Sequence, residues 1–296
     1  MWNKIVAFFM SIFAFIASLF GVNVNTDTDY RYTDLAYGSH ERQVLDLCLP
    51  EGVTGDMGLV LMIHGGAWIA GDKEGYKEAL EYASSSLGVA AAAINYRYLG
   101  ENVTMYEILD DIDAALALIK EKGENVGLDI NKVLLTGSSA GAHLSLLYAY
   151  SRATTAPVKP VAVVSDCGPT DLTDEAFYIN NALGNEETIA DLLSLCIGID
   201  FSYAQRGDYV KELQAISPLF YVDENTVPTV INHGMQDNIV PFSNATAVVE
   251  KLKENGVKHD FNIYPNSGHG LDNDPDSRKI ADELMHSYIK TYLIEN

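Results

Sequence analysis

Cysteine is scarce in this chain of 296 residues, which contains Cys48, Cys167 and Cys196. Three cysteines cannot all pair with one another, and their spacing matches no metal-binding motif. Cys48 lies in a run typical of a strand and Cys167 follows another such run. We therefore expect buried free thiols, with a single disulfide as the alternative.

Positive charge is also scarce, because 19 Lys and Arg residues stand against 41 Asp and Glu residues. The formal net charge of -22 argues against nucleic acid and anionic membrane surfaces as partners, since both would be repelled. It favours a neutral or cationic substrate. A hydrophobic content of 48% with 20% charged residues excludes intrinsic disorder, and no repeat or low-complexity linker divides the chain.

An uninterrupted apolar run from Ile5 to Phe20 follows a single positive charge at Lys4. This pattern is typical of a secretory signal peptide, and its length also suits an uncleaved membrane anchor. We interpret residues 1–21 as one or the other and expect a secreted or cell-surface protein. Residues 22–296 are expected to form one domain.

Apolar runs of strand length alternate with stretches of helical periodicity along the rest of the chain. The alternation predicts crossover units and a mainly parallel central sheet flanked by helices, the α/β class. Gly123 is expected to end one of the helices, and Ser243 to cap the start of another. Strands are expected at 30–37, 43–49, 59–63, 89–94, 133–136, 161–164, 228–231 and 261–264, with helices near 74–86, 105–119, 243–255 and 276–293.

The segment from Gly137 to Gly141 reads G-S-S-A-G between an apolar strand and a helical stripe. In that context G-x-S-x-G predicts a sharp turn that exposes the central serine as a nucleophile. Ser139 is that serine. Because it stands at the start of a helix, free backbone N–H groups are expected beside it.

A serine nucleophile needs a general base and an acid that orients the base. Of the seven histidines, His269 is the strongest candidate, because it lies in a flexible turn between the last strand and the last helix. His64 and His233 also follow strands, but there we expect structural hydrogen bonds. Asp237 is the preferred acid, and Asp166 and Asp223 remain alternatives.

The run His64-Gly65-Gly66-Ala67-Trp68 follows a buried strand. Acyl transfer passes through an oxyanion that backbone N–H donors must stabilise, and glycine lets a backbone approach such an oxygen closely. We predict that the N–H groups of Gly65, Gly66 and Ala140 form this oxyanion hole. Two aromatic side chains near these motifs, Trp68 and Tyr98, are expected to contact the substrate.

The acidic run from Asp272 to Asp276 imitates the ligand spacing of a calcium loop. The glycine that such a loop requires is replaced by Ser277, and Pro275 interrupts the run. We therefore expect these carboxylates to cap the final helix. No metal and no cofactor is predicted.

Together these motifs resemble the α/β-hydrolase superfamily, and within it the hormone-sensitive-lipase-like and bifunctional acetylxylan/feruloyl esterase group. Ala67 departs from the third glycine common in that group, and the chain before the first strand is too short for a large N-terminal cap. The likeness runs from about residue 30 to the end. Its motifs are His64–Trp68, Asn95–Arg97, Gly137–Gly141, Ile216–Pro218, His233-Gly234 with Asp237, Val240-Pro241, and Tyr264-Pro265 with Gly268–Gly270.

The resemblance implies a secreted serine carboxylesterase that hydrolyses acetyl or feruloyl-type esters of small molecules or oligosaccharides. Alternatives are a short-chain lipid esterase, an exopeptidase, an arylformamidase, or a non-catalytic binding protein on the same fold. Residues 170–217 show no strand pattern and are expected to form a small lid over the site. Two fates are open to its aromatic side chains Phe177, Tyr178, Phe201 and Tyr203: they offer a surface to an acyl group or sugar ring, or they pack in the core, which is the commoner fate of such residues.

Overall fold

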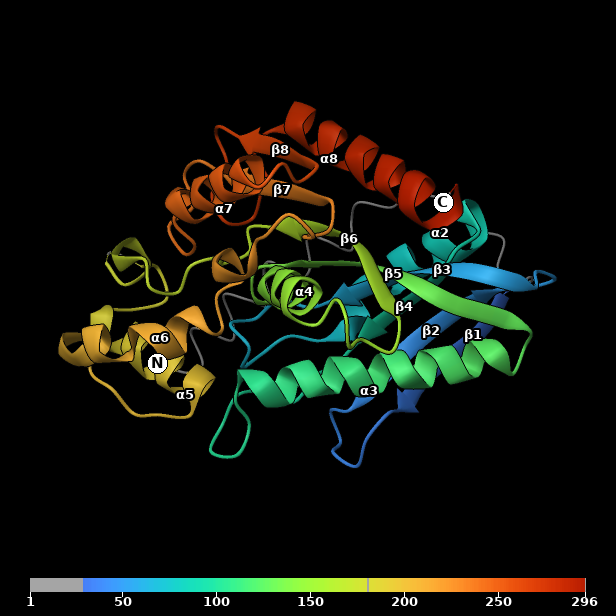
Figure 1. Cartoon of the computed structure of the whole chain (residues 1–296), viewed down its shortest axis with the longest axis horizontal. Helices are drawn as coiled ribbons and strands as arrows, with labels where there is room; N and C mark the ends of the chain where they lie inside the picture. The colour runs from blue at the N-terminus through green and yellow to red at the C-terminus, as the bar shows by residue number, and fades with distance from the viewer. Residues whose placement is uncertain (1–28, 180, 296) are drawn as a thin grey trace.

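A computed structural model describes residues 29–179 and 181–295, so the predicted leader at 1–21 lies outside the described residues. No helix within the described part is both long enough and apolar enough to span a membrane. One sheet of eight strands runs through the molecule in the order β1-β2-β4-β3-β5-β6-β7-β8 (Figure 1). The strands are β1 (Asp29–Ala36), β2 (Val44–Pro50), β3 (Gly55–Ile63), β4 (Ala90–Ile94), β5 (Leu128–Ser138), β6 (Lys159–Asp166), β7 (Thr229–Gly234) and β8 (His259–Tyr264).

The sheet is parallel from β4 to β8, and only β2 pairs antiparallel, with β1 and with β4. Helices cover both faces (Figure 1). The expected α/β class and mainly parallel sheet are confirmed. The helices are α2 (Lys77–Leu87), α3 (Met105–Glu124), α4 (Ala140–Ser151), α5 (Glu186–Ile197), α6 (Val210–Gln214), α7 (Phe242–Glu254) and α8 (Pro275–Tyr288), which continues as η6 (Ile289–Ile294).

Strand β3 shows how the core divides between the two faces. Leu59, Leu61 and Ile63 pack into the larger cluster, with side chains from α3, α4, α5 and α7. Val60 and Met62 point the other way, into a cluster with α2, α8 and η6. Because successive side chains of a strand alternate between faces, a continuous apolar run is what a strand buried on both sides requires.

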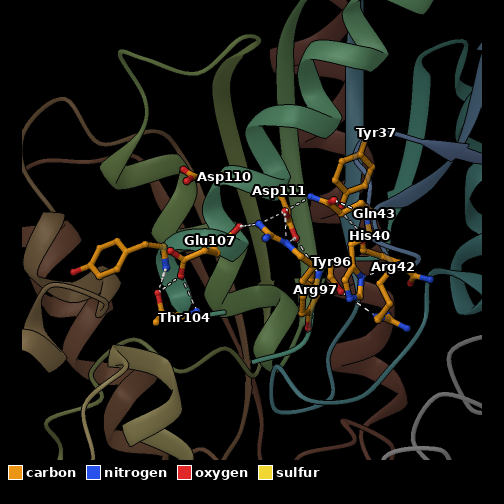
Figure 2. A network of polar contacts seen from close by, with 12 residues as sticks. Tyr37, His40, Arg42, Gln43, Tyr96, Arg97, Thr104, Glu107, Asp110 and Asp111 are labelled. Carbon is orange, nitrogen blue, oxygen red and sulfur yellow. Dashed lines mark hydrogen bonds and ion pairs between the residues drawn. The ribbon is translucent and has the colours of Figure 1, made fainter. Parts of the chain in front are cut away.

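A buried carboxylate joins the first hairpin to the centre of the fold. Asp111, on α3, is 1% exposed and accepts hydrogen bonds from the Gln43 side chain and from the backbone and guanidinium of Arg97 (Figure 2). Gln43 lies at the turn between β1 and β2, and Arg97 follows β4. The charged pair therefore fixes that turn at the carboxyl edge of the sheet.

Residues 170–217 form an insertion between β6 and β7 that contains α5, α6 and the 3-10 helices η3 (Glu175–Phe177) and η4 (Tyr203–Tyr209). The Asn181 side chain donates to Ile239 O, and Ala182 N donates to Asn238 O. The insertion is thus attached to the loop that carries Asp237. Whether it acts as a lid stays a prediction.

The aromatic side chains of this insertion pack into the hydrophobic core. Phe177, Tyr178 and Phe201 are between 1% and 4% exposed and belong to the hydrophobic core. Of the two fates considered, core packing therefore holds for these three, because the insertion needs them to fill its own interior. Tyr203 packs against the same core from a half-buried position.

Two predicted helix ends are also corrected. Gly123 lies inside α3, where a Cβ would approach Ile130 Cδ1 to 2.8 Å, so close packing rather than capping requires glycine there. Helix α7 begins at Phe242 after Pro241, and the Ser243 hydroxyl donates to Asp174 instead of capping the helix. All three cysteines are buried and free, as expected.

We expect Asp111→Ala to lower the free energy of unfolding by about 3 kcal/mol, because it leaves Arg97 without its buried partner. The control is Asp110→Ala on the same helix. Asp110 is exposed and pairs with Arg152, so its loss should cost less than about 1 kcal/mol. Urea unfolding of both variants measures the difference. Equal losses would contradict a structural role for the Asp111 network.

Candidate active site

The turn between β5 and α4 has the geometry predicted for a nucleophile. Ser139 has a φ of 54° and a ψ of -120°, a left-handed backbone conformation that side chains rarely adopt. A Cβ on Gly137 would lie 2.4 Å from Ile63 O, and a Cβ on Gly141 would lie 1.9 Å from the same atom. Both flanking glycines are therefore required by the contact of the turn with the end of β3.

His269 and Asp237 form a close pair at the carboxyl ends of β8 and β7. His269 Nδ1 lies 2.7 Å from Asp237 Oδ2, and both side chains are at most 4% exposed. The other oxygen, Oδ1, accepts hydrogen bonds of 2.9 Å from the N–H groups of Ile239 and Val240. Burial raises the pKa of Asp237, but the neighbouring His269 outweighs that effect and the pKa falls below its ordinary value. The carboxyl group is therefore ionised at neutral pH.

The loops that carry this pair are held together by their backbones. A Cβ on Gly234 would lie 2.4 Å from Gly268 O, and Gln236 N donates to Ser267 O. Asp274, from the acidic run after His269, accepts hydrogen bonds from Ser267 Oγ and from Asn266. Its carboxylate thus holds the histidine loop, whereas the sequence predicted only a helix cap.

The second ring nitrogen of His269 has no partner among the described residues. His269 Nε2 is buried and makes no hydrogen bond within the described part of the chain. Buried polar atoms in folded proteins almost always have a partner, so an orphan one calls for an explanation. The imidazole is held at Nδ1 by a carboxylate and presents Nε2 for another group.

The two alternative acids lie in other networks. Asp166, at the end of β6, accepts from the Asn232 side chain, which in turn accepts from Asn262. Asp223 binds the backbone N–H of Asn225 in a surface turn. Of the three acids considered, Asp237 is the one that the structure brings to His269.

The glycine loop after β3 lies against the serine turn. A Cβ on Gly65 would lie 2.7 Å from Ser138 O and 3.3 Å from Ser139 Cβ. Gly66 has a φ of 114°, and Ala67 and Trp68 have φ values of 49° and 60°. Ala67 therefore occupies a left-handed conformation that glycine would adopt without strain.

Trp68 does not lie where the sequence analysis placed it. Its side chain is 2% exposed, and the indole N–H donates to His143 Nδ1 over 3.2 Å. His143 Nε2 lies 2.8 Å from Ile216 O, in the insertion. Trp68 thus anchors the glycine loop to helix α4 and is too buried to contact a substrate. Sequence reasoning missed His143, because a histidine inside an apolar helix carries no signal of its partners.

The structural roles expected for His64 and His233 are confirmed. His64 stacks on Tyr96 with ring centroids 4.3 Å apart, and burial lowers its pKa to about 4. His233 Nε2 lies 3.0 Å from Val240 O, and burial lowers its pKa too. Both imidazoles are neutral at pH 7.

Within the described residues, one group of three side chains is close enough together to hold a metal ion: the ligand atoms of Cys167, His233 and Asp237 lie within 4.8 Å of one another. Burial, however, raises the pKa of the Cys167 thiol well above its ordinary value, which disfavours the thiolate that binds metals. Asp237 is already engaged by His269. The arrangement suits a carboxylate–imidazole pair better than a metal centre.

Comparison with known proteins identifies the family. The family model described as BD-FAE matches residues 45–252, more than two thirds of the chain. The chain belongs to the BD-FAE family. The match includes Gly65, Ser139 and Asp237 and ends before His269.

Curated relatives carry esterase names. The chain is 29% identical over 238 residues to a probable carboxylic ester hydrolase, LipM, of Mycobacterium tuberculosis, covering 76% of this chain and 53% of that protein. It is 26% identical to a probable isoprenylcysteine alpha-carbonyl methylesterase of Oryza sativa, covering 79% and 56% respectively. The chain thus spans about half the length of these relatives.

Solved structures share the fold. Esterase B from Lactobacillus rhamnosis superposes with a TM-score of 0.73 at 21% identity, over 97% of this chain and 94% of that one. A truncated carbohydrate esterase from gut microbiota gives a TM-score of 0.66 at 24% identity, over 89% and 98%. Both likenesses support the α/β-hydrolase fold.

We expect acid to destabilise the protein between pH 6.5 and pH 4. Burial lowers the pKa of His64 and of His143 from 6.5 to about 4. In this interval the unfolded chain binds more protons than the folded one, so this part of the stability is complete above pH 6.5 and is lost as the pH falls. Urea unfolding at several pH values measures the slope.

The matched variants are His143→Gln and His286→Gln. His143→Gln should flatten the slope, because it removes one of the three buried imidazoles, those of His64, His143 and His233, whose pKa burial lowers. His286 is exposed and contacts Tyr82 at the surface, so His286→Gln should leave the slope unchanged. A slope that His143→Gln does not alter would contradict this account.

Proposed function

We propose that the chain is a serine carboxylesterase in which Ser139 is the nucleophile, His269 the general base and Asp237 the orienting acid. The observation that carries the proposal is the pairing of His269 Nδ1 with a buried, ionised Asp237 while Nε2 has no partner in the described chain. The strained serine turn follows β5, which is separated from β7 by β6, at the same carboxyl edge of the parallel sheet. Catalytic hydrogen bonds often tighten only when substrate is bound, so a serine–histidine bond is not required beforehand.

In the first half-reaction His269 Nε2 takes the proton of the Ser139 hydroxyl as its oxygen attacks the ester carbonyl carbon. The carbonyl oxygen becomes an oxyanion, which the backbone N–H groups of Gly65, Gly66 and Ala140 stabilise. Gly65 lies against Ser139, and Ala140 is the first residue of α4, where backbone N–H groups have no intrahelical acceptor. His269 then gives the proton to the departing alcohol, leaving an acyl group on Ser139.

In the second half-reaction water attacks the acyl-enzyme while His269 takes its proton, and the acid product leaves. Asp237 keeps Nδ1 protonated, so that Nε2 has a lone pair for the incoming proton. Asp237 also stabilises the imidazolium that forms in each step. The hydrogen bonds from Ile239 and Val240 fix the carboxylate during the cycle.

The substrate class that we propose is acetyl or feruloyl-type esters of carbohydrates, in a secreted or cell-surface protein. Membership of the BD-FAE family and the fold shared with a gut carbohydrate esterase support this choice. The apolar run at 5–20 supports export, and the net charge of -22 supports a neutral partner. Release of acetate and ferulate from acetylated xylan and arabinoxylan oligomers tests the class; turnover confined to lipid esters or peptides would contradict it.

Ser139→Ala should lower ester turnover on the order of 10⁴-fold or more while leaving the fold intact, because it removes one hydroxyl from a turn. Ser151→Ala, at the other end of α4, is the control and should retain activity within about twofold. Hydrolysis of 4-nitrophenyl acetate measures both. Activity near wild type in Ser139→Ala would assign the nucleophile to another residue.

Asp237→Asn should lower turnover on the order of 10⁴-fold, since an amide favours the wrong tautomer of His269. Asp166→Asn is the matched comparison, because Asp166 also stands at the carboxyl end of a parallel strand but contacts Asn232 instead of a histidine. Its effect on kcat should be far smaller. The reverse ranking of the two variants would transfer the role to Asp166.

A further inference from the structure

A polar pocket of about 520 Å³ opens beside the glycine loop and is not used by the proposed mechanism. Three of its lining residues, His40, Glu41 and Arg42, come from the turn between β1 and β2. The others are Asp72, Asn95 and Tyr98. Tyr98 is thus placed at a pocket, as the prediction of substrate contact requires.

The pocket lies at the same edge of the sheet as Ser139. Strand β4 is parallel to β3 and β5, so Asn95 follows it at the carboxyl edge where Ser139 follows β5. Strand β2 runs antiparallel to β4, and Asn95 N donates to Val44 O at its first residue. The turn that precedes Val44 must therefore lie at this edge too.

Direct contacts connect the pocket to the serine turn through Gly71. Arg42 Nη2 and the Tyr98 hydroxyl both donate to Gly71 O. A Cβ on Gly71 would lie 2.2 Å from Gly65 O, and Gly65 lies against Ser139. The pocket and the serine turn are therefore connected by this one loop.

The polar groups of the pocket can both donate and accept hydrogen bonds. Arg42 is fixed by Tyr96 O (Figure 2) and by Gly71 O. Among the described residues, its Nη1 has one long contact of 3.7 Å, with Asp72. No hydrogen bond or ion pair in the described part of the chain engages the Glu41 carboxylate. Hydroxyl groups, which donate and accept, match such a lining.

The charges of the pocket select against an anionic ligand. The Arg42 guanidinium stacks on Tyr98, 3.7 Å from the ring centroid, and its charge is offset by Asp72. Glu41 has no such partner, so the pocket carries an excess of negative charge on a protein that is itself strongly acidic. A carboxylate on the ligand would be repelled.

We propose that this pocket binds a neutral sugar residue on the alcohol side of a carbohydrate ester and disfavours a uronate there. The inference rests on the proposed esterase function. Glu41 and Asp72 accept hydrogen bonds from sugar hydroxyls, and Arg42 Nη1 donates one. The preference for a neutral sugar over a uronate follows from the negative charge of the Glu41 carboxylate.

The test compares kcat/KM for acetylated xylo-oligosaccharides with kcat/KM for acetylated galacturonate oligomers. The wild-type protein favours the neutral substrate. Glu41→Gln and Asp72→Asn should each lower the neutral-to-acidic ratio about threefold, because each removes one negative charge from the pocket. Asparagine caps a helix as well as aspartate does, so Asp72→Asn preserves the start of the following 3-10 helix.

The control is Glu51→Gln. Glu51 is an exposed carboxylate just after β2, at the opposite edge of the sheet, and its removal should leave the ratio unchanged. Ratios in Glu41→Gln and Asp72→Asn equal to that of Glu51→Gln would overturn the pocket assignment while leaving the esterase proposal standing.

Hydrolysis of 4-nitrophenyl acetate, which has no sugar, separates the remaining outcomes. Turnover of this ester without turnover of either carbohydrate ester would overturn both the pocket assignment and the carbohydrate substrate class, but not the catalytic triad. Absence of turnover of all three substrates by the wild-type protein would overturn the proposed function itself.

Discussion

The close approach of the β5–α4 turn to the end of β3 is the constraint on which the candidate site depends. Ile63 O lies where the Cβ atoms of residues 137 and 141 would be, so both positions must be glycine. That contact holds the serine turn against the start of the glycine loop. Gly65, which lacks a side chain, allows the glycine loop to place its own backbone beside Ser139. Oxyanion stabilisation in the proposed mechanism is a consequence of this backbone packing.

The candidate site also depends on the electrostatic stabilisation of the Asp237 carboxylate. A buried carboxylate is costly unless donors surround it, and Asp237 receives two backbone N–H groups and one imidazole. The insertion contributes indirectly, since Asn181 and Ala182 bind the loop that supplies those N–H groups. Site geometry and insertion are therefore coupled through hydrogen bonds from the Asn181 side chain and the Ala182 backbone N–H.

The strands and the triad candidates could be predicted because each is a local pattern. Apolar runs mark buried strands, and glycines two residues either side of Ser139 mark a turn with no room for side chains. The order of strands made Asp237 the preferred partner of His269, but the structure was needed to choose it over Asp166 and Asp223. By contrast, the role of Trp68 depended on His143, 75 residues away, and neither residue signals the other in the sequence.

Long-range polar pairs were equally invisible to sequence reasoning. From the sequence, Asp111 is a charged residue on an amphipathic helix and would be expected to face solvent. The fold instead places Arg97 and Gln43 beside it. The pocket at Arg42 required the hairpin turn to reach the carboxyl edge, which follows from the antiparallel pairing of β2. Ala67 shows the opposite case, since its left-handed φ agrees with the glycine that the family resemblance leads us to expect there.

Covalent labelling tests the central claim most directly, because a serine activated by this histidine–carboxylate pair should react with a fluorophosphonate. Peptide mass spectrometry of the labelled protein should place the adduct on Ser139, in one copy per chain. Absence of an adduct on folded protein, or an adduct on another residue, would contradict the proposed mechanism and favour a non-catalytic binding protein or a different nucleophile.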